Sequence, residues 1–159
     1  MATSAVSVVL LATAQQAAQA ATQNPLLVQV AKGAPSNGAA LQKYQLEGYN
    51  YIDAKVLAAY WGEPTPYAAK LRLGSKMLMF GWQDGRIHIR AARGQALRKP
   101  LALMPVWYTD GGYTFEDAEV LGKFWGGGLE NSKGKMARLL IKGEDASIKA
   151  ALKAARQRR

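Results

Sequence analysis

Apolar positions recur at helical spacing in two stretches of this chain, and the two stretches match each other in register. Residues 48–62 read GYNYIDAKVLAAYWG and residues 112–126 read GYTFEDAEVLGKFWG, at a constant offset of 64 positions. In each stretch an Ala, a Leu, a small residue and a Trp fall at i, i+3, i+4 and i+7, which is one face of a helix. Identity this dense indicates that one helical unit occurs twice in the chain.

Both predicted helices carry the same start and stop signals. Asn50 and Thr114 are preferred N-cap residues, and Asp53 and Asp117 follow three positions later, where a capping box needs an acid. A glycine after each Trp then ends the helix. Two carboxylates at matched positions also suggest general acid–base chemistry. Their place in the first turn explains them as capping residues, and we favour that interpretation.

A second helix is predicted in each unit. It starts near Pro66 in the first unit, because proline favours the first helical position, and near Asn131 in the second. The inward positions of the first copy are Ala69, Leu73, Met77 and Phe80, and those of the second are Met136, Leu139 and Leu140.

The third segment of each unit is basic. Its second copy has a clear helical pattern, whereas residues 86–90 of the first copy alternate as in a short strand. We follow the repeat and predict a helix in both. The expected fold class is therefore all-α: a tandem duplication of a roughly 50-residue, three-segment helical unit, with an additional N-terminal helix or signal segment.

The organisation along the chain follows from these elements. We expect a signal peptide or Ala-rich N-terminal helix over residues 1–21, a connector over 22–45, unit 1 over 46–98, a linker over 99–111 and unit 2 over 112–159. Residues 32–40 are expected to be flexible. The linker contains two prolines but also Leu101, Leu103, Val106 and Trp107, so it is expected to pack along both units and join them.

The N-terminal 31 residues contain no charged side chain. An apolar run over residues 5–12 and the small-x-small sequence Ala18-Gln19-Ala20 are typical of a secretory signal, although no basic residue precedes the run. The alternative is an Ala-rich helix that packs on the body. The run is too short for a transmembrane span. We favour the signal and expect an exported or periplasmic protein, with a cytoplasmic location as the alternative.

The formal net charge of +10 indicates which kinds of partner the protein would bind. A balance this basic suggests an anionic partner, which could be nucleic acid, an acidic surface lipid or an acidic protein, and solubility alone is the plain alternative. The third segments supply the basic side chains, which would form two related patches or one continuous face. The predicted anionic-partner face consists of Arg86, Arg90, Arg93, Lys149, Lys153 and Arg156.

The aromatic residues divide into two groups. Trp61 and Trp125 lie on the apolar face in both copies and are predicted to be core residues. Trp82, Trp107 and Tyr108 have no counterpart in the repeat and sit in connecting segments, so they are candidates for partner contact. Filling the groove between the units is the commoner use of such residues.

No catalytic, cofactor or metal site is predicted. The chain has no cysteine, which excludes disulfides, thiolate zinc sites and a cysteine nucleophile. His88 is the only histidine and is expected to be a solvated member of the basic face. The glycines at 126–128 and Lys133 fail the spacing of a phosphate loop.

Two functions follow as expectations. The first is a small non-enzymatic helical binding or structural protein, exported, with a basic face for an anionic partner. The alternative is an intracellular nucleic-acid-binding protein, because the first two helices of each unit, joined at Gly62 in unit 1, resemble a helix-turn-helix. The sequence leaves the oligomeric state open.

Overall fold

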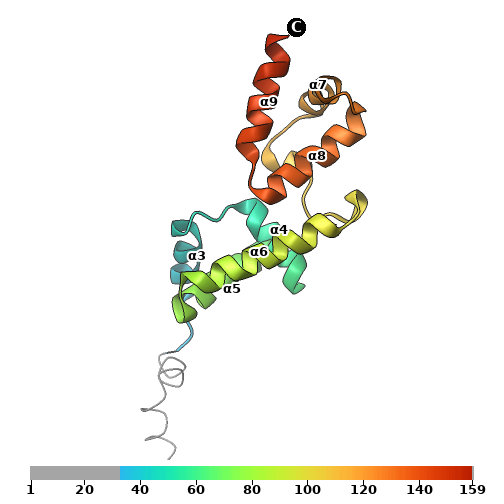
Figure 1. The fold of residues 1–159 in the computed structure, drawn as a ribbon. Helices are drawn as coiled ribbons and strands as arrows, with labels where there is room; N and C mark the ends of the chain where they lie inside the picture. The colour runs from blue at the N-terminus through green and yellow to red at the C-terminus, as the bar shows by residue number, and fades with distance from the viewer. Residues whose placement is uncertain (1–32, 159) are drawn as a thin grey trace, which may run out of the picture. The chain divides into compact units, whose positions relative to one another are not determined.

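The computed structural model describes residues 33–158, and all regular elements in that range are helical (Figure 1). The all-α fold class is confirmed for these residues. The segment expected to be a signal or an N-terminal helix lies outside the described range. The elements are α3 Asn37–Leu46, α4 Tyr51–Trp61, α5 Pro66–Phe80, α6 Trp82–Arg98, η1 Leu101–Leu103, η2 Tyr108–Gly111, α7 Phe115–Trp125, α8 Gly128–Lys142 and α9 Asp145–Gln157.

Helices α4 and α7 begin at the predicted capping boxes. The Asn50 side chain accepts from the Asp53 N–H at 3.1 Å, and the Asp53 carboxylate accepts from the Asn50 N–H at 3.1 Å. Thr114 and Asp117 exchange the same two bonds at 3.2 and 3.0 Å. The glycine after each helix adopts a left-handed conformation, with φ of 69° and 75°. Asp53 and Asp117 therefore have the capping role that the sequence predicted.

The later helices follow the prediction with one shift. Helix α5 starts at Pro66 with Thr65 as its N-cap, as expected. Helix α8 starts at Gly128, three residues before the predicted Asn131, because the glycine turn is shorter than expected and Leu129 already packs against the core. Residues 86–90 are helical within α6, because a helix buries Ile89 and the alanines that follow it on one face.

Helix α3 corrects the expectation of a flexible connector before unit 1. It covers residues 37–46 and packs along α5, with Ala40 and Tyr44 fully buried. The close approach depends on Gly74 of α5. A Cβ atom there would overlap the Ala40 carbonyl oxygen and lie 2.5 Å from its carbon. The sequence pattern missed this helix because its apolar side is small and glycine and proline precede it.

One hydrophobic core runs from α3 to α9, and Leu57, Leu73, Leu121 and Met136 are fully buried in it. Other side chains depart from the prediction. Trp61 and Trp125 are half-buried at the edge of this core, because each is the last residue of its helix. Phe80 was expected inside but is 55% exposed, because α5 ends there and the chain turns at Gly81.

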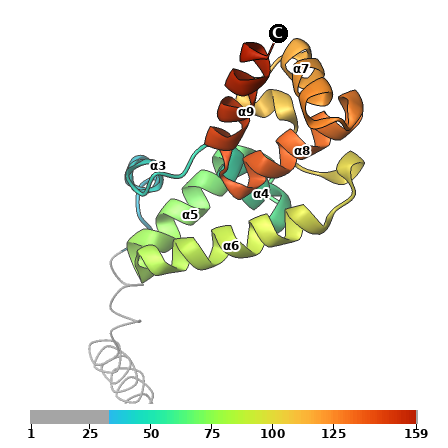
Figure 2. The same cartoon turned by 45° about the horizontal axis from the view of Figure 1, so that its top comes forward.

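The linker joins the two predicted units by contributing to the core. Met104 and Val106 are buried, whereas Leu103 and Trp107 remain exposed. Helix α8 contacts both α4 and α6, and both ribbon views show it beside them (Figures 1 and 2). Polar cross-links accompany this packing. Lys55 of α4 pairs with Asp110 of η2 at 2.7 Å, and Arg138 of α8 donates to the Leu97 carbonyl of α6 at 2.8 Å.

The α3–α5 contact gives a first prediction. Replacing Gly74 with alanine should lower the free energy of unfolding by about 1–3 kcal/mol, because α3 must move away from the new Cβ. Gly94→Ala is the matched control. Its Cβ would find only one atom, an Arg98 nitrogen at 3.8 Å, so it should leave stability unchanged or raise it by up to about 1 kcal/mol. Urea unfolding of both variants measures the difference, and equal stability would contradict the close packing of α3.

Candidate functional site

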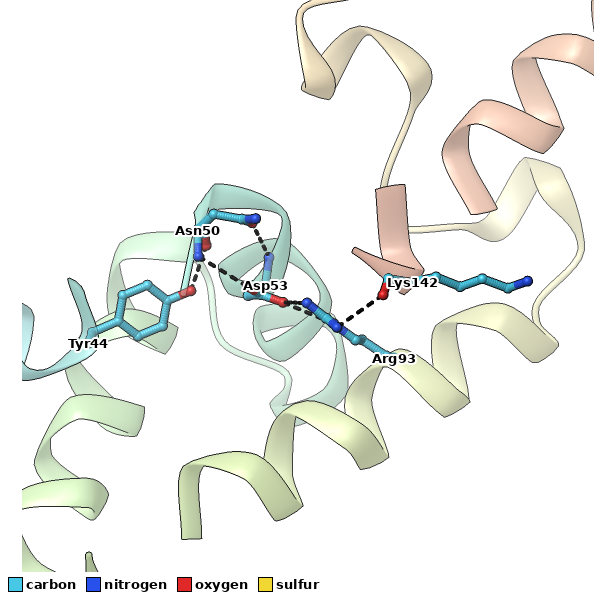
Figure 3. A network of polar contacts seen from close by, with 5 residues as sticks. All are labelled: Tyr44, Asn50, Asp53, Arg93 and Lys142. Carbon is cyan, nitrogen blue, oxygen red and sulfur yellow. Dashed lines mark hydrogen bonds and ion pairs between the residues drawn. The ribbon is translucent and has the colours of Figure 1, made fainter. Parts of the chain in front are cut away.

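Arg93 of α6 lies at the centre of a polar network (Figure 3). Its guanidinium donates from Nε and Nη2 to Asp53 Oδ1 at 3.0 and 2.6 Å, and from Nη1 to the Lys142 carbonyl at 3.2 Å. Asp53 is only 2% exposed. The Lys142 carbonyl belongs to the last turn of α8, where the helix dipole favours a cation. Arg93 therefore ties α4, α6 and α8 together.

The network extends to α3 through the start of α4. The Tyr44 hydroxyl donates to the Asn50 carbonyl at 2.6 Å, beside the capping box that holds Asp53 (Figure 3). Burial is the main reason that the pKa of Tyr44 is raised well above its usual range, with the Asp53 charge adding to the effect. The tyrosine therefore keeps its proton and its hydrogen bond across the ordinary pH range.

A corresponding pair occurs in the second half of the chain. Arg156 of α9 donates from Nη2 to Asp117 Oδ1 at 2.7 Å. This arginine side chain is 62% exposed and makes one hydrogen bond, whereas Arg93 makes three. Solvent screens an exposed pair, so this bridge contributes much less than the buried one.

The first predicted basic patch lines a groove of about 760 Å³ along α6. Trp82, Arg86, Arg90 and Arg93 follow one another at spacings of three and four residues, so they share one face of the helix. Arg86 and Arg90 are exposed, and the guanidinium of Arg86 lies 5.2 Å from the centre of the Trp82 ring. Arg93 lines the groove but already has its partners. The face open to an anion thus consists of Arg86 and Arg90.

The second predicted patch lines a separate, smaller groove of about 430 Å³ on α9. Lys149, Lys153 and Arg156 are all exposed there. Lys149 forms an ion pair with Asp145 at 2.5 Å, and Arg156 is bound by Asp117, while Lys153 joins none of the ion pairs found in residues 33–158. The six predicted basic residues therefore line two grooves on different helices.

Asp145 links α9 to the start of the second half. It accepts from the Tyr113 hydroxyl at 2.5 Å as well as from Lys149. The Lys149 hydrogen bond, followed by that of Tyr113, holds the pKa of Asp145 below its usual range. Burial is the main cause that raises the pKa of Tyr113. These contacts fix the first turn of α9 and engage Lys149 in the structure.

The three candidate contact aromatics lie in different places. Trp82 and Trp107 are each 46% exposed, so half of each ring is open to solvent. Trp82 begins α6 and lines its groove, whereas Trp107 lies within the linker, directly before η2. Tyr108 is half-buried, with the Lys133 ammonium 6.0 Å from its ring centre. The structure thus brings only Trp82 together with predicted basic residues.

His88 is not the solvated residue that the sequence predicted. It is half-buried, in a T-shaped contact with the Trp61 ring at a centroid distance of 5.2 Å, and its Nε2 lies 3.4 Å from Asp84. Burial lowers its pKa, and the nearby Asp84 only partly offsets this. His88 is therefore a packing residue at the edge of the core.

Comparison with known proteins assigns no family to this chain, and the described residues show no metal site. The chain matches no known protein family, and it has no match among curated proteins or solved structures. Within residues 33–158, no group of three or more metal-ligating side chains comes together. None of the described helices is both long and apolar enough to cross a bilayer.

Sequence reasoning missed the role of Arg93 because it treated every basic residue of α6 as solvated. A signal for the correct role was present. An acid recurs at Asp53 and Asp117, and an arginine recurs at the aligned positions 93 and 156. An acidic and a basic residue that recur together at aligned positions are expected to form an ion pair with each other. The exposure of Phe80 beside Trp82 had no such signal, because it depends on where α5 ends.

The two arginines give a matched pair of predictions. Arg93→Ala should lower the free energy of unfolding by about 3–5 kcal/mol, because it leaves the Asp53 carboxylate buried without its charge partner. Arg156→Ala should cost only about 0.2–1 kcal/mol, because the Arg156 side chain is 62% exposed and solvent screens its charge. Denaturant unfolding at pH 7 compares them, and a similar loss in both variants would show that burial does not set the difference.

Proposed function

We propose that this protein is a small, non-enzymatic helical binding protein, and that the exposed basic face of α6 holds an anionic partner. The observation that carries the proposal is the α6 groove, where Arg86 and Arg90 stand exposed beside a half-exposed Trp82. Two cations one helical turn apart attract phosphate, sulfate or carboxylate groups. A neighbouring aromatic ring adds contact area for the same partner.

The structural use of the recurring carboxylates supports binding over catalysis. Asp53 and Asp117 each accept a capping bond and an arginine, so neither carboxylate is left open to move a proton on a substrate. His88 packs between Trp61 and Asp84 outside the α6 groove. An enzyme would need an acid, base or nucleophile poised at a cavity.

We further propose that the chain arose by tandem duplication of its three-helix unit. Helices α4 and α7 have the same length and the same capping box, and α5 and α8 have the same length. An aspartate of the first helix is bound by an arginine of the third in each half. These features support the interpretation that the 64-residue register match reflects one repeated unit.

The alternative function is nucleic-acid binding by tandem helix-turn-helix-like units. It requires the second helix of a unit to enter the major groove of DNA. Helix α5 packs against α3, α4 and α6, and α8 packs against α4, α6, α7 and α9. This packing leaves few side chains of either helix free to read bases, so it counts against the alternative.

Export is part of the proposal and rests on the uncharged N-terminal segment. The protein isolated from its native cells should begin after Ala20, because Ala18-Gln19-Ala20 fits the signal-peptidase pattern. N-terminal sequencing measures this directly. An uncleaved chain recovered from the cytoplasm would contradict export and bring back the intracellular alternative.

Polyanion binding tests the α6 face. Heparin and duplex DNA should bind weakly at ~50 mM salt and be released near ~200 mM, with little preference for DNA sequence. Arg86→Gln/Arg90→Gln should lower the slope of log affinity against log salt by about two. Fluorescence anisotropy over a salt series measures both quantities.

The control variant removes the same charge elsewhere. Lys123→Gln/Lys135→Gln changes exposed lysines of α7 and α8 and should leave affinity nearer to that of the unchanged protein. Equal losses of polyanion affinity in the two double variants would indicate that the net charge of the protein attracts the polyanion and that no specific site on α6 is involved. Absence of binding at low salt would overturn the proposal. Tight binding to one duplex at physiological salt, lost on changing α5, would instead favour the helix-turn-helix alternative.

A further inference from the structure

The corner between α5 and α6 gathers exposed apolar side chains on a basic molecule. Only Gly81 separates the two helices, and its φ of 90° lets the chain turn sharply. Phe80 before it is 55% exposed and Trp82 after it is 46% exposed. Leu78 and Ile87 nearby are also exposed, at 44% and 66%. Phe80, Trp82 and Leu78 form what we call the α5–α6 corner, and Ile87 lies beyond Arg86, further along α6.

Cationic side chains stand directly behind this corner on both helices. Lys76 precedes Phe80 by one turn of α5, with its ammonium 5.6 Å from the ring centre. Arg86 follows Trp82 by one turn of α6, with its guanidinium 5.2 Å from the ring centre. Arg90 lies a turn further along. One turn of helix is about 5.4 Å long, so the rings lie at the tip and the charges one layer back.

This order of groups suits the interface of an anionic membrane. Aromatic rings settle at the level of the headgroups, and aliphatic side chains reach the acyl boundary about 5–10 Å deep. Lys and Arg side chains one layer behind would meet the lipid phosphates. Asp84 bears the opposite charge at this corner and lies 3.8 Å from Lys76. Arg86 and Arg90 have no carboxylate partner within residues 33–158 and keep the local charge positive.

We propose that the α5–α6 corner inserts into the surface of an anionic lipid bilayer, which is then the partner of the basic α6 face. The inference rests on the proposed function, because Arg86 and Arg90 serve both. Exposed Leu78 favours lipid over nucleic acid, since an aliphatic side chain does not stack on bases. The corner lies at the end of the α5–α6 hairpin away from α7–α9 (Figures 1 and 2).

The test uses the full chain with vesicles of phosphatidylglycerol and phosphatidylcholine, and with vesicles of phosphatidylcholine alone. The protein should co-sediment with the anionic vesicles and be released by salt. Trp82→Ala should weaken this partitioning at least about tenfold, because a ring buried at the interface is lost. Trp107→Ala is the matched control, since Trp107 has the same 46% exposure and lies outside the corner. It should bind like the unchanged protein.

A second readout locates the contact. Lipids brominated near the headgroup should quench tryptophan fluorescence in the Trp107→Ala variant and much less in the Trp82→Ala variant. Both variants carry the same N-terminal segment, so any membrane affinity of that segment cancels. Circular dichroism checks that both are folded.

The outcomes separate this inference from the proposed function. Loss of vesicle binding in Trp82→Ala but not in Trp107→Ala supports the corner. Loss of heparin binding in Arg86→Gln/Arg90→Gln but not in Lys123→Gln/Lys135→Gln supports the basic face. Absence of vesicle binding, or equal losses of vesicle binding in the two tryptophan variants, overturns the membrane role of the corner. The basic face still stands in that case if heparin binding depends on Arg86 and Arg90. If the unchanged protein binds neither polyanions nor anionic vesicles at low salt, the basic face is overturned as well.

Discussion

The Arg93 guanidinium on α6 binds the Asp53 carboxylate of α4 and the Lys142 carbonyl of α8, and the arrangement of these three helices depends on it. Asp53 is buried, so its negative charge needs a cationic hydrogen-bond partner to compensate for the lost contact with water. Arg93 is that partner and also satisfies a carbonyl at the end of α8. A planar group with several donors can bind both at once, which a lysine could not do in the same way.

The second half shows what the same pair does when its arginine lies mostly in solvent. Asp117 and Arg156 lie at the corresponding positions of α7 and α9, but the arginine is mostly exposed. Nothing in the described chain covers this pair as α8 covers the first. One sequence pattern therefore serves two purposes: a link between the two halves in one place and a surface ion pair in the other.

The use of charge in the structure limits which basic residues can serve a partner. Arg93, Arg156 and Lys149 are bound by aspartates, and Arg86 rests beside the Trp82 ring. Binding at an engaged arginine would require an anion to compete with a carboxylate. For this reason we place the partner on the outer side of α6, where cations and exposed apolar side chains come together.

The sequence by itself determined much of the local structure: that the segments of the two predicted units are helical, where α4 and α7 begin and end, and which acids form capping boxes. These features depend on residues within a few positions of each other, such as Asn50 with Asp53. It also determined most of the apolar face of α5. Periodicity could not reveal helix α3, because the reason for its position is a glycine more than thirty residues later, at Gly74.

Only the tertiary structure decided which charges are structural and which apolar side chains are exposed. Arg93 and Arg86 lie two turns apart on one helix, yet one meets Asp53 and the other faces solvent. Phe80 and Met77 lie on neighbouring turns of α5, yet only Met77 is buried. Burial depends on what the rest of the chain places opposite a residue, and that is set by helix packing across long sequence separations.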